Sequence, residues 1–363
     1  MLFENANQFF SSSSTEADES MLDAFICEGQ AITHEFEIEQ IKKEAECFVK
    51  TSRNLQEAKV MFLTEGFWES IKNFFLKIWN WIKEKASAVW NWIKNLFGGS
   101  SALSISDRWF QLGKRLRDGD KPKINKTSKS TRKEKVTSTR YNLLINKLPD
   151  VSKGLDAAIA EVAAETVDII QSTSEIKSDE RKTKEETIIA TFLSKLGDSD
   201  LESDDKKSWS STSKIVTRTF VEKKDEKKDQ EVEAKNFTYD KIDAFMKADF
   251  AALLGLEHAG KVISAAVTKI QHAAEMNAKE AGLKATKDSD HAKHFSSNIT
   301  FGAGLCGKLA QHSVSFVKDV ASAAKSVLSE RISLVESCYS SLEESYTPSS
   351  NDSNGSNPLS VFF

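Results

Sequence analysis

The sequence is poor in the residues that turn or cross-link a chain. Its 363 residues include 4 prolines, 15 glycines and 4 cysteines. So little proline and glycine argues against a turn-rich β fold and favours long helices joined by polar linkers. Cys27, Cys47, Cys306 and Cys338 are far apart and form no CxxC pair, so they predict neither a zinc site nor a disulfide framework. We therefore expect a reducing compartment.

Long apolar runs are also missing. No run of 18 or more apolar residues occurs, so we expect no membrane-spanning helix. The first residues, MLFENANQFF, lack the basic start and apolar core of a secretory signal. No Ser/His/Asp or Cys/His arrangement is recognisable, so we expect neither an enzyme nor a cofactor. Asp290, His291 and His294 lack a further ligand, and a polar surface loop is favoured there over a metal site.

The net charge of −4 is unevenly distributed. Residues 1–65 carry 13 acidic and 5 basic side chains, and the rest of the chain carries 41 acidic and 45 basic ones. Loss of the first 65 residues would therefore make the net charge positive, which favours a place beside a polyanion such as DNA.

Residues 108–140 are strongly basic, with 12 basic and 3 acidic side chains in a Ser/Thr-rich setting. Such a segment can contact phosphates without reading base sequence, and a solvated linker is the alternative. The candidate nucleic-acid-binding residues are Arg115, Arg117, Lys121, Lys123, Lys126, Lys129, Arg132 and Lys133.

Residues 66–97 hold five of the seven tryptophans and repeat every 11 residues. Eleven residues make almost three helical turns, so the repeats fall on one face of an amphipathic helix. Its apolar stripe must be covered by a partner helix, by the protein's own core or by a bilayer surface, and self-association is also open. The candidate membrane- or partner-binding residues are Trp68, Ile71, Phe75, Trp79, Ile82, Trp90 and Ile93.

A short pattern recurs before this helix: Leu or Ile, any residue, Glu, then a small residue. It occurs at Glu28-Gly29, Glu57-Ala58 and Glu65-Gly66, and the last pair directly precedes the tryptophan repeat. These junctions resemble sites cut by the prohead protease of large tailed bacteriophages, which cleaves head-internal and core proteins after such a glutamate.

The resemblance implies a non-enzymatic internal head protein of the virion, made in the host cytoplasm and matured after Glu65 in the capsid interior. The partners it implies are phage head or core proteins and the prohead protease, with packaged DNA, the host membrane and further copies of the chain as additional candidates. The alternative is a membrane-active protein, pore-forming or toxin-like, whose amphipathic helix is masked by the N-terminal segment.

We expect a mostly α fold, with long amphipathic helices and a helical bundle joined by disordered charged linkers. Residues 214–221 are a candidate strand within the charged loop, and the G-x-G-x-x-G pattern at 302–307 is interpreted as close helix packing rather than a phosphate loop. The expected segments are an acidic propeptide (1–65), the tryptophan-rich helix (66–99), a basic linker (100–150), a helical segment (151–197), a charged loop (198–238), a helical bundle (239–346) and a disordered tail (347–363).

Overall fold

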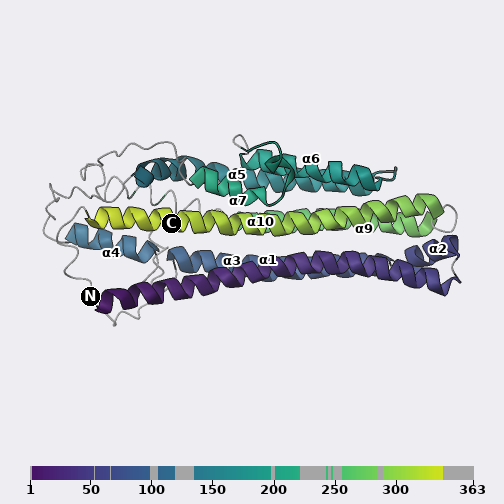
Figure 1. Cartoon of the computed structure of the whole chain (residues 1–363), viewed down its shortest axis with the longest axis horizontal. Helices are drawn as coiled ribbons and strands as arrows, with labels where there is room; N and C mark the ends of the chain where they lie inside the picture. The colour runs from purple at the N-terminus through teal and green to yellow at the C-terminus, as the bar shows by residue number, and fades with distance from the viewer. Residues whose placement is uncertain are drawn as a thin grey trace.

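The computed structural model describes residues 2–52, 54–65, 67–98, 105–118, 135–197, 201–220, 243, 247, 256–284 and 289–337. These residues form helices and turns without any strand, which confirms the predicted mostly α fold. The long helices lie side by side along the longest axis of the molecule (Figure 1). In the same part of the chain, no helix has the length and apolar character needed to cross a membrane.

The described helices follow one another along the chain from residue 2 to residue 337. The elements are α1 (Leu2–Lys50), α2 (Leu55–Glu65), α3 (Phe67–Gly98), α4 (Ile105–Asp118), α5 (Lys135–Gln171), α6 (Ser178–Leu196), the 3₁₀ turn η1 (Asp205–Lys207), α7 (Ser211–Phe220), α9 (Glu257–Lys284) and α10 (Ser289–Ser337). In Figure 1, α1 and α3 form one layer, α9 and α10 the middle layer, and α5, α6 and α7 the layer beyond.

Helix α10 is the centre of the bundle because it contacts α1, α3, α5, α7 and α9. Its buried face combines large and small side chains, with Phe316 and Ile299 fully buried beside alanines. The small residues let neighbouring helices approach closely, and the large ones fill the space between them. The apolar side chains of all the described long helices join in one continuous core.

The glycines of the 302–307 pattern lie inside α10 and face other helices. A side chain at Gly302 would overlap with Ile170 of α5, and one at Gly307 would overlap with Thr33 of α1. Both glycines therefore serve helix packing, as the sequence predicts, because a phosphate loop requires a turn that a continuous helix does not contain.

Four sequence-based expectations need correction. The polar surface loop expected at Asp290, His291 and His294 is wrong, because these residues lie in the first turns of α10, which begins at Ser289. The candidate strand at 214–221 is wrong, because residues 211–220 form helix α7, in which Ile215 and Val216 are buried. Packing on α10 decides the conformation there, against the strand preference of these β-branched residues. Trp209 is buried, although it lies in the segment expected to be a charged loop (198–238). The segment expected to be a basic linker (100–150) contains helix α4 and the start of α5. Residues 347–363 lie outside the described part of the chain.

Candidate functional site: the covered face of α3

The apolar stripe of α3 is buried within the bundle. Ile71, Phe75 and Ile82 have no exposed surface, and residues on the opposite side of the helix, such as Lys72 and Asn80, are exposed. Burying one large apolar side chain stabilises a protein by about 1.5–3 kcal/mol, so this stripe drives the association of α3 with its neighbours. Helices α1, α2, α4, α9 and α10 contact α3.

Helix α1 covers part of the stripe through ring packing. The rings of Phe36 and Phe74 stack with centroids 4.3 Å apart. About two helical turns from this pair on each helix, a Cβ added at Gly29 would lie 2.7 Å from Cζ2 of Trp81. Glycine at this position therefore lets the backbone of α1 rest against the indole ring, which is 3% exposed.

Polar contacts border this apolar interface. The Lys77 ammonium lies 3.0 Å from a Glu35 carboxylate oxygen. Ser70 donates a hydrogen bond to Glu39 (3.1 Å) and accepts one from the Lys43 ammonium (3.1 Å). The hydrogen bond from Lys43 is the main reason why the pKa of Glu39 is lower than its usual value. Acidic side chains of α1 thus meet polar and basic groups of α3.

The tryptophans predicted to widen the stripe do not all lie inside. Trp81 is buried under α1, whereas Trp68 and Trp79 are half-buried at its edge. The Lys83 ammonium sits over the Trp79 ring, 5.1 Å from its centroid, in a cation–π arrangement. The side chains of Trp90 and Ile93 lie outside the described residues, although the α3 backbone continues to Gly98.

The three candidate cleavage junctions differ in their surroundings. Glu28 and Gly29 lie within α1, with Gly29 against Trp81. Glu57 and Ala58 lie within α2, where Ala58 is 3% exposed. By contrast, α2 ends at Glu65 and α3 begins at Phe67, so this junction falls between two helices. The side chain of Glu65 and the whole of Gly66 lie outside the described residues.

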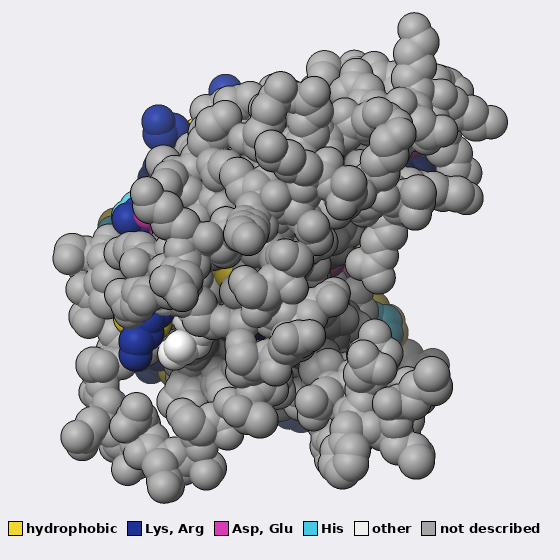
Figure 2. Space-filling view, turned by 90° about the vertical axis from the view of Figure 1, so that its left-hand side faces the viewer, with side chains coloured by type: hydrophobic (Ala, Val, Ile, Leu, Met, Phe, Trp, Pro, Cys, Tyr) yellow, Lys and Arg dark blue, Asp and Glu magenta, His cyan; other side chains and the backbone are white. Residues whose placement is uncertain are grey.

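The candidate nucleic-acid-binding residues are brought together only in part. Arg115 and Arg117 lie on the α4 backbone, but their side chains are outside the described residues. So are Lys121, Lys123, Lys126, Lys129, Arg132 and Lys133 in their entirety. Figure 2 views the end of the molecule near α4, and the described side chains visible along one edge include Lys and Arg.

Trp109 anchors α4 to the bundle. Its ring is fully buried and its Nε1–H donates a 3.0 Å hydrogen bond to Asp243. An indole that is buried along its body and satisfied at its N–H fixes the orientation of a helix. Burial of its ring favours this anchoring role over stacking on a nucleic-acid base.

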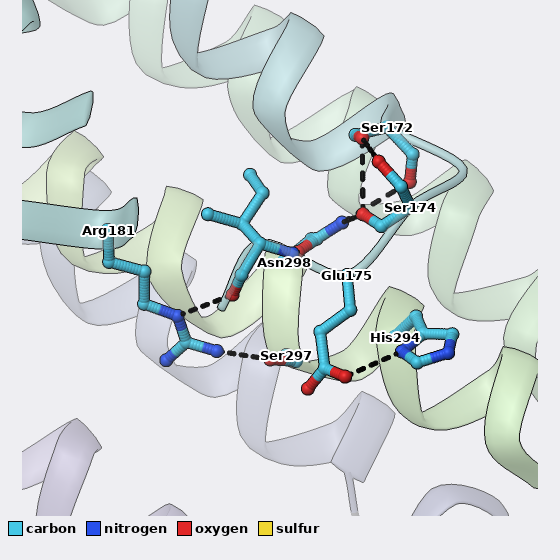
Figure 3. Close-up of polar contacts among 8 residues, drawn as sticks. Ser172, Ser174, Glu175, Arg181, His294, Ser297 and Asn298 are labelled. Atoms are coloured by element: carbon cyan, nitrogen blue, oxygen red, sulfur yellow. Dashed lines mark hydrogen bonds and ion pairs between the residues drawn. The ribbon is translucent and has the colours of Figure 1, made fainter. Parts of the chain in front are cut away.

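Sequence reasoning missed a polar cluster where α5 passes into α6. The Asn298 side chain donates to the carbonyls of Ser172 (3.3 Å) and Ser174 (2.9 Å) and accepts a bond from the Ile176 N–H (3.2 Å). Arg181 donates to the Ile176 carbonyl (3.2 Å) and to the hydroxyl of the α10 residue Ser297 (Figure 3). Asn298 is fully buried, so these bonds satisfy backbone groups that water does not reach.

Two titratable groups of α10, Cys306 and His312, have pKa values shifted by burial. Burial raises the pKa of the Cys306 thiol to about 12, which keeps it protonated and poorly nucleophilic. Burial also lowers the pKa of His312 to about 4, and its ring stacks on Trp209 with centroids 5.2 Å apart. Lys308, next to the glycine pattern, forms a 2.7 Å ion pair with Glu185. In the described part of the chain, no three His, Cys, Asp or Glu residues are arranged to hold a metal ion, and His294 instead lies 3.0 Å from Glu175.

No protein-family model, curated protein or solved structure matches this chain. Its function is therefore inferred from the residues and contacts above.

Proposed function

We propose that this protein is a non-enzymatic structural protein whose first 65 residues cover an amphipathic helix and are removed by cleavage after Glu65. The observation that carries the proposal is the junction itself. Glu65 ends α2 and Phe67 begins α3, so the cut separates the cover from the covered helix. Proteases act most readily on chain between regular elements, and the other two candidate junctions lie inside packed helices.

The charges support the same division of the chain. The segment before residue 66 carries 13 acidic and 5 basic side chains, and the remainder carries 41 acidic and 45 basic ones. Cleavage changes the protein from net negative to net positive. A net positive body is attracted to packaged DNA, with Arg115, Arg117 and residues 121–133 as the proposed contacts.

The proposed location follows from the resemblance of the Glu65–Gly66 junction to prohead protease sites. On this proposal the chain is made in the host cytoplasm, enters the capsid interior of a large tailed phage with head or core proteins, and is cut there. It then stays beside the DNA or leaves with it, and the part of α3 that α1 and α2 had covered contacts a membrane, a protein partner or another copy of the chain.

The natural N-terminus tests this proposal directly. Mass spectrometry of the protein isolated from its particle should find Gly66 as the first residue. Finding Met1 on the mature protein would refute maturation after Glu65.

Accessibility of the junction is tested separately with a Glu-specific endoprotease on the purified full chain. Cleavage after Glu65 should precede cleavage after Glu57 and Glu28, because those two lie within helices. Glu65→Gln should abolish only the early cut. Equal rates at the three sites would contradict the structural basis of the proposal.

A second candidate function, membrane activity of the uncovered helix, is favoured by the edge positions of Trp68 and Trp79 and by the Lys83 cation over the Trp79 ring. Tryptophan at the border of an apolar face, with lysine outside it, suits the boundary of a bilayer. Protein cut at residue 65 should then release dye from anionic vesicles, and the triple variant Trp68→Ala/Trp79→Ala/Trp90→Ala should not. Equal leakage from uncut and cut protein would reject masking, and no leakage from either would reject membrane activity.

A further inference from the structure

A cleft of about 650 Å³ opens along α10 between α1 and α6. Its floor is the α10 face that includes Thr300 and Gly304, and Phe62 of α2 also lines it. The volume falls within the range of small-molecule binding sites in proteins. One wall belongs to the N-terminal segment and the other to the body of the bundle.

Gln40 of α1 lines this cleft and has unsatisfied hydrogen-bonding groups. Its side chain is buried, with 6% of the residue's surface exposed. Neither its amide nitrogen nor its amide oxygen has a hydrogen-bond partner among the described residues. Buried amides are nearly always paired, so an orphaned one in the wall of a cleft marks a place for a ligand that both donates and accepts.

The two walls of the cleft carry opposite charges. Glu37 and Glu44 lie on the α1 side, and Arg181 and Lys182 lie on the α6 side. Glu185 also lines the α6 side, but its carboxylate is paired with Lys308 of α10 at 2.7 Å. Arg181 already holds the α5–α6 connection through its bond to the Ile176 carbonyl, whereas Lys182 is exposed. A purely anionic ligand would meet the two carboxylates, and a purely cationic one would meet the two cations. A ligand with both charges suits both walls.

We propose that this cleft binds a short peptide with free termini. Its carboxylate faces Lys182 and Arg181, its ammonium group faces Glu44 and Glu37, and an internal peptide unit pairs with the Gln40 amide as both donor and acceptor. The apolar rings of Phe62 and Phe301 contact its side chains. Because α1 supplies one wall, the site belongs to the uncut chain, and peptide binding does not depend on whether cleavage ever occurs.

Equilibrium dialysis of the full-length chain against a pool of tripeptides tests the proposal. The retained peptides are identified by mass spectrometry, and a second pool has acetylated N-termini and amidated C-termini. Peptides with free termini should be retained, and capping should weaken retention at least about tenfold because the charged ends are lost. Retention of neither pool, or equal retention of both, would overturn the proposal.

Gln40→Leu separates the site from the rest of the surface, with Gln30→Leu, an exposed position on the same helix, as the matched control. Gln40→Leu should weaken peptide retention by about tenfold, since two hydrogen bonds are lost, while Gln30→Leu should not change it. Without peptide, Gln40→Leu should leave the melting temperature unchanged or raise it, because it removes an unpaired buried amide. A lowered melting temperature would show that Gln40 has a structural role, and equal retention by the two variants would show that it does not contact the peptide; either result would overturn the inference.

Failure of peptide binding can be distinguished from failure of the proposed maturation after Glu65. Peptide binding is measured on the uncut chain, whereas maturation is read from the natural N-terminus. Protein cut at residue 65 and freed of its N-terminal segment should lose peptide binding, because Gln40, Glu37 and Glu44 leave with that segment. Undiminished binding after removal would place the peptide elsewhere and overturn the inference.

Discussion

The stacked pair Phe36 and Phe74 provides a quantitative test of whether α1 is a separable cover. Phe36 is 3% exposed and its ring lies 4.3 Å from that of Phe74. Phe36→Ala should therefore cost about 3–5 kcal/mol, the range measured for phenylalanine truncation in packed cores. If α1 opens from the body as a unit, the whole loss appears in its opening equilibrium constant, which should rise roughly 100- to 4000-fold at about 1.4 kcal/mol for each factor of ten.

Hydrogen exchange measured by mass spectrometry reports this opening segment by segment. Amides of residues 24–50 should lose protection by the factor above, whereas amides of α5 and α9 should keep theirs. Phe48→Ala is the matched control, because Phe48 lies on the same helix but is 36% exposed. That variant should change protection by less than about 0.5 kcal/mol.

Two results would refute this reasoning. Indistinguishable exchange in the Phe36→Ala and Phe48→Ala proteins would mean that the ring stack does not hold α1 to α3. Equal loss of protection in α1, α5 and α9 would mean that α1 unfolds only with the whole bundle, and then it is part of the core rather than a cover.

Three further predictions concern the bundle. Asn298→Leu should destabilise the fold by about 3 kcal/mol in urea unfolding, because it leaves the Ser174 carbonyl and the Ile176 N–H without their hydrogen bonds. Asn80→Leu, at an exposed position, should have little effect. Equal effects of the two variants would show that these hydrogen bonds do not stabilise the fold. Gly154→Ala should destabilise the fold, because a Cβ added there would overlap with the Lys195 carbonyl oxygen. Gly304→Ala should stabilise the fold by about 0.5–1 kcal/mol, because a Cβ added there would have its nearest neighbour at 3.7 Å. Melting temperatures of the two variants that move in the same direction would contradict this. The pKa of His312 is lowered to about 4, chiefly by burial and also by Lys308, so its contribution to stability is present above its unfolded pKa near 6.5 and is lost as pH falls toward 4. The difference in unfolding free energy between wild type and His312→Phe should therefore shift by roughly 3 kcal/mol across that window, and a constant difference would be inconsistent with a buried neutral imidazole.

The sequence predicts those parts of the fold that depend on local pattern. The α3 stripe can be predicted because Ile71, Phe75 and Ile82 recur at helical spacing, which places them on one apolar face that is buried in the structure. The boundary at Gly98 is legible from the glycine pair that follows the last aromatic residue. In both cases the deciding residues lie within a few turns of one another.

What covers the stripe is not legible in the same way. Gly29 and Phe36 are ordinary residues in a weakly amphipathic, acidic segment, and only their meeting with Trp81 and Phe74 gives them a role. The hydrogen bonds of Asn298 connect α10 to backbone groups more than a hundred residues away in the sequence, so no local pattern could predict them. Helix α7 was misjudged because Ile215 and Val216 favour a strand in isolation but are buried on a neighbouring helix.

The position of the α2–α3 boundary has a consequence for any form of the protein severed there. Among the described residues, α2 ends at Glu65 and α3 begins at Phe67, so scission after Glu65 leaves two polypeptides that each keep their described helices whole. Their continued attachment would then be an ordinary bimolecular equilibrium, governed by how concentrated the two pieces are. At the high concentration of a confined volume the two pieces would remain paired, and dilution after release would expose the tryptophan-lined surface of α3.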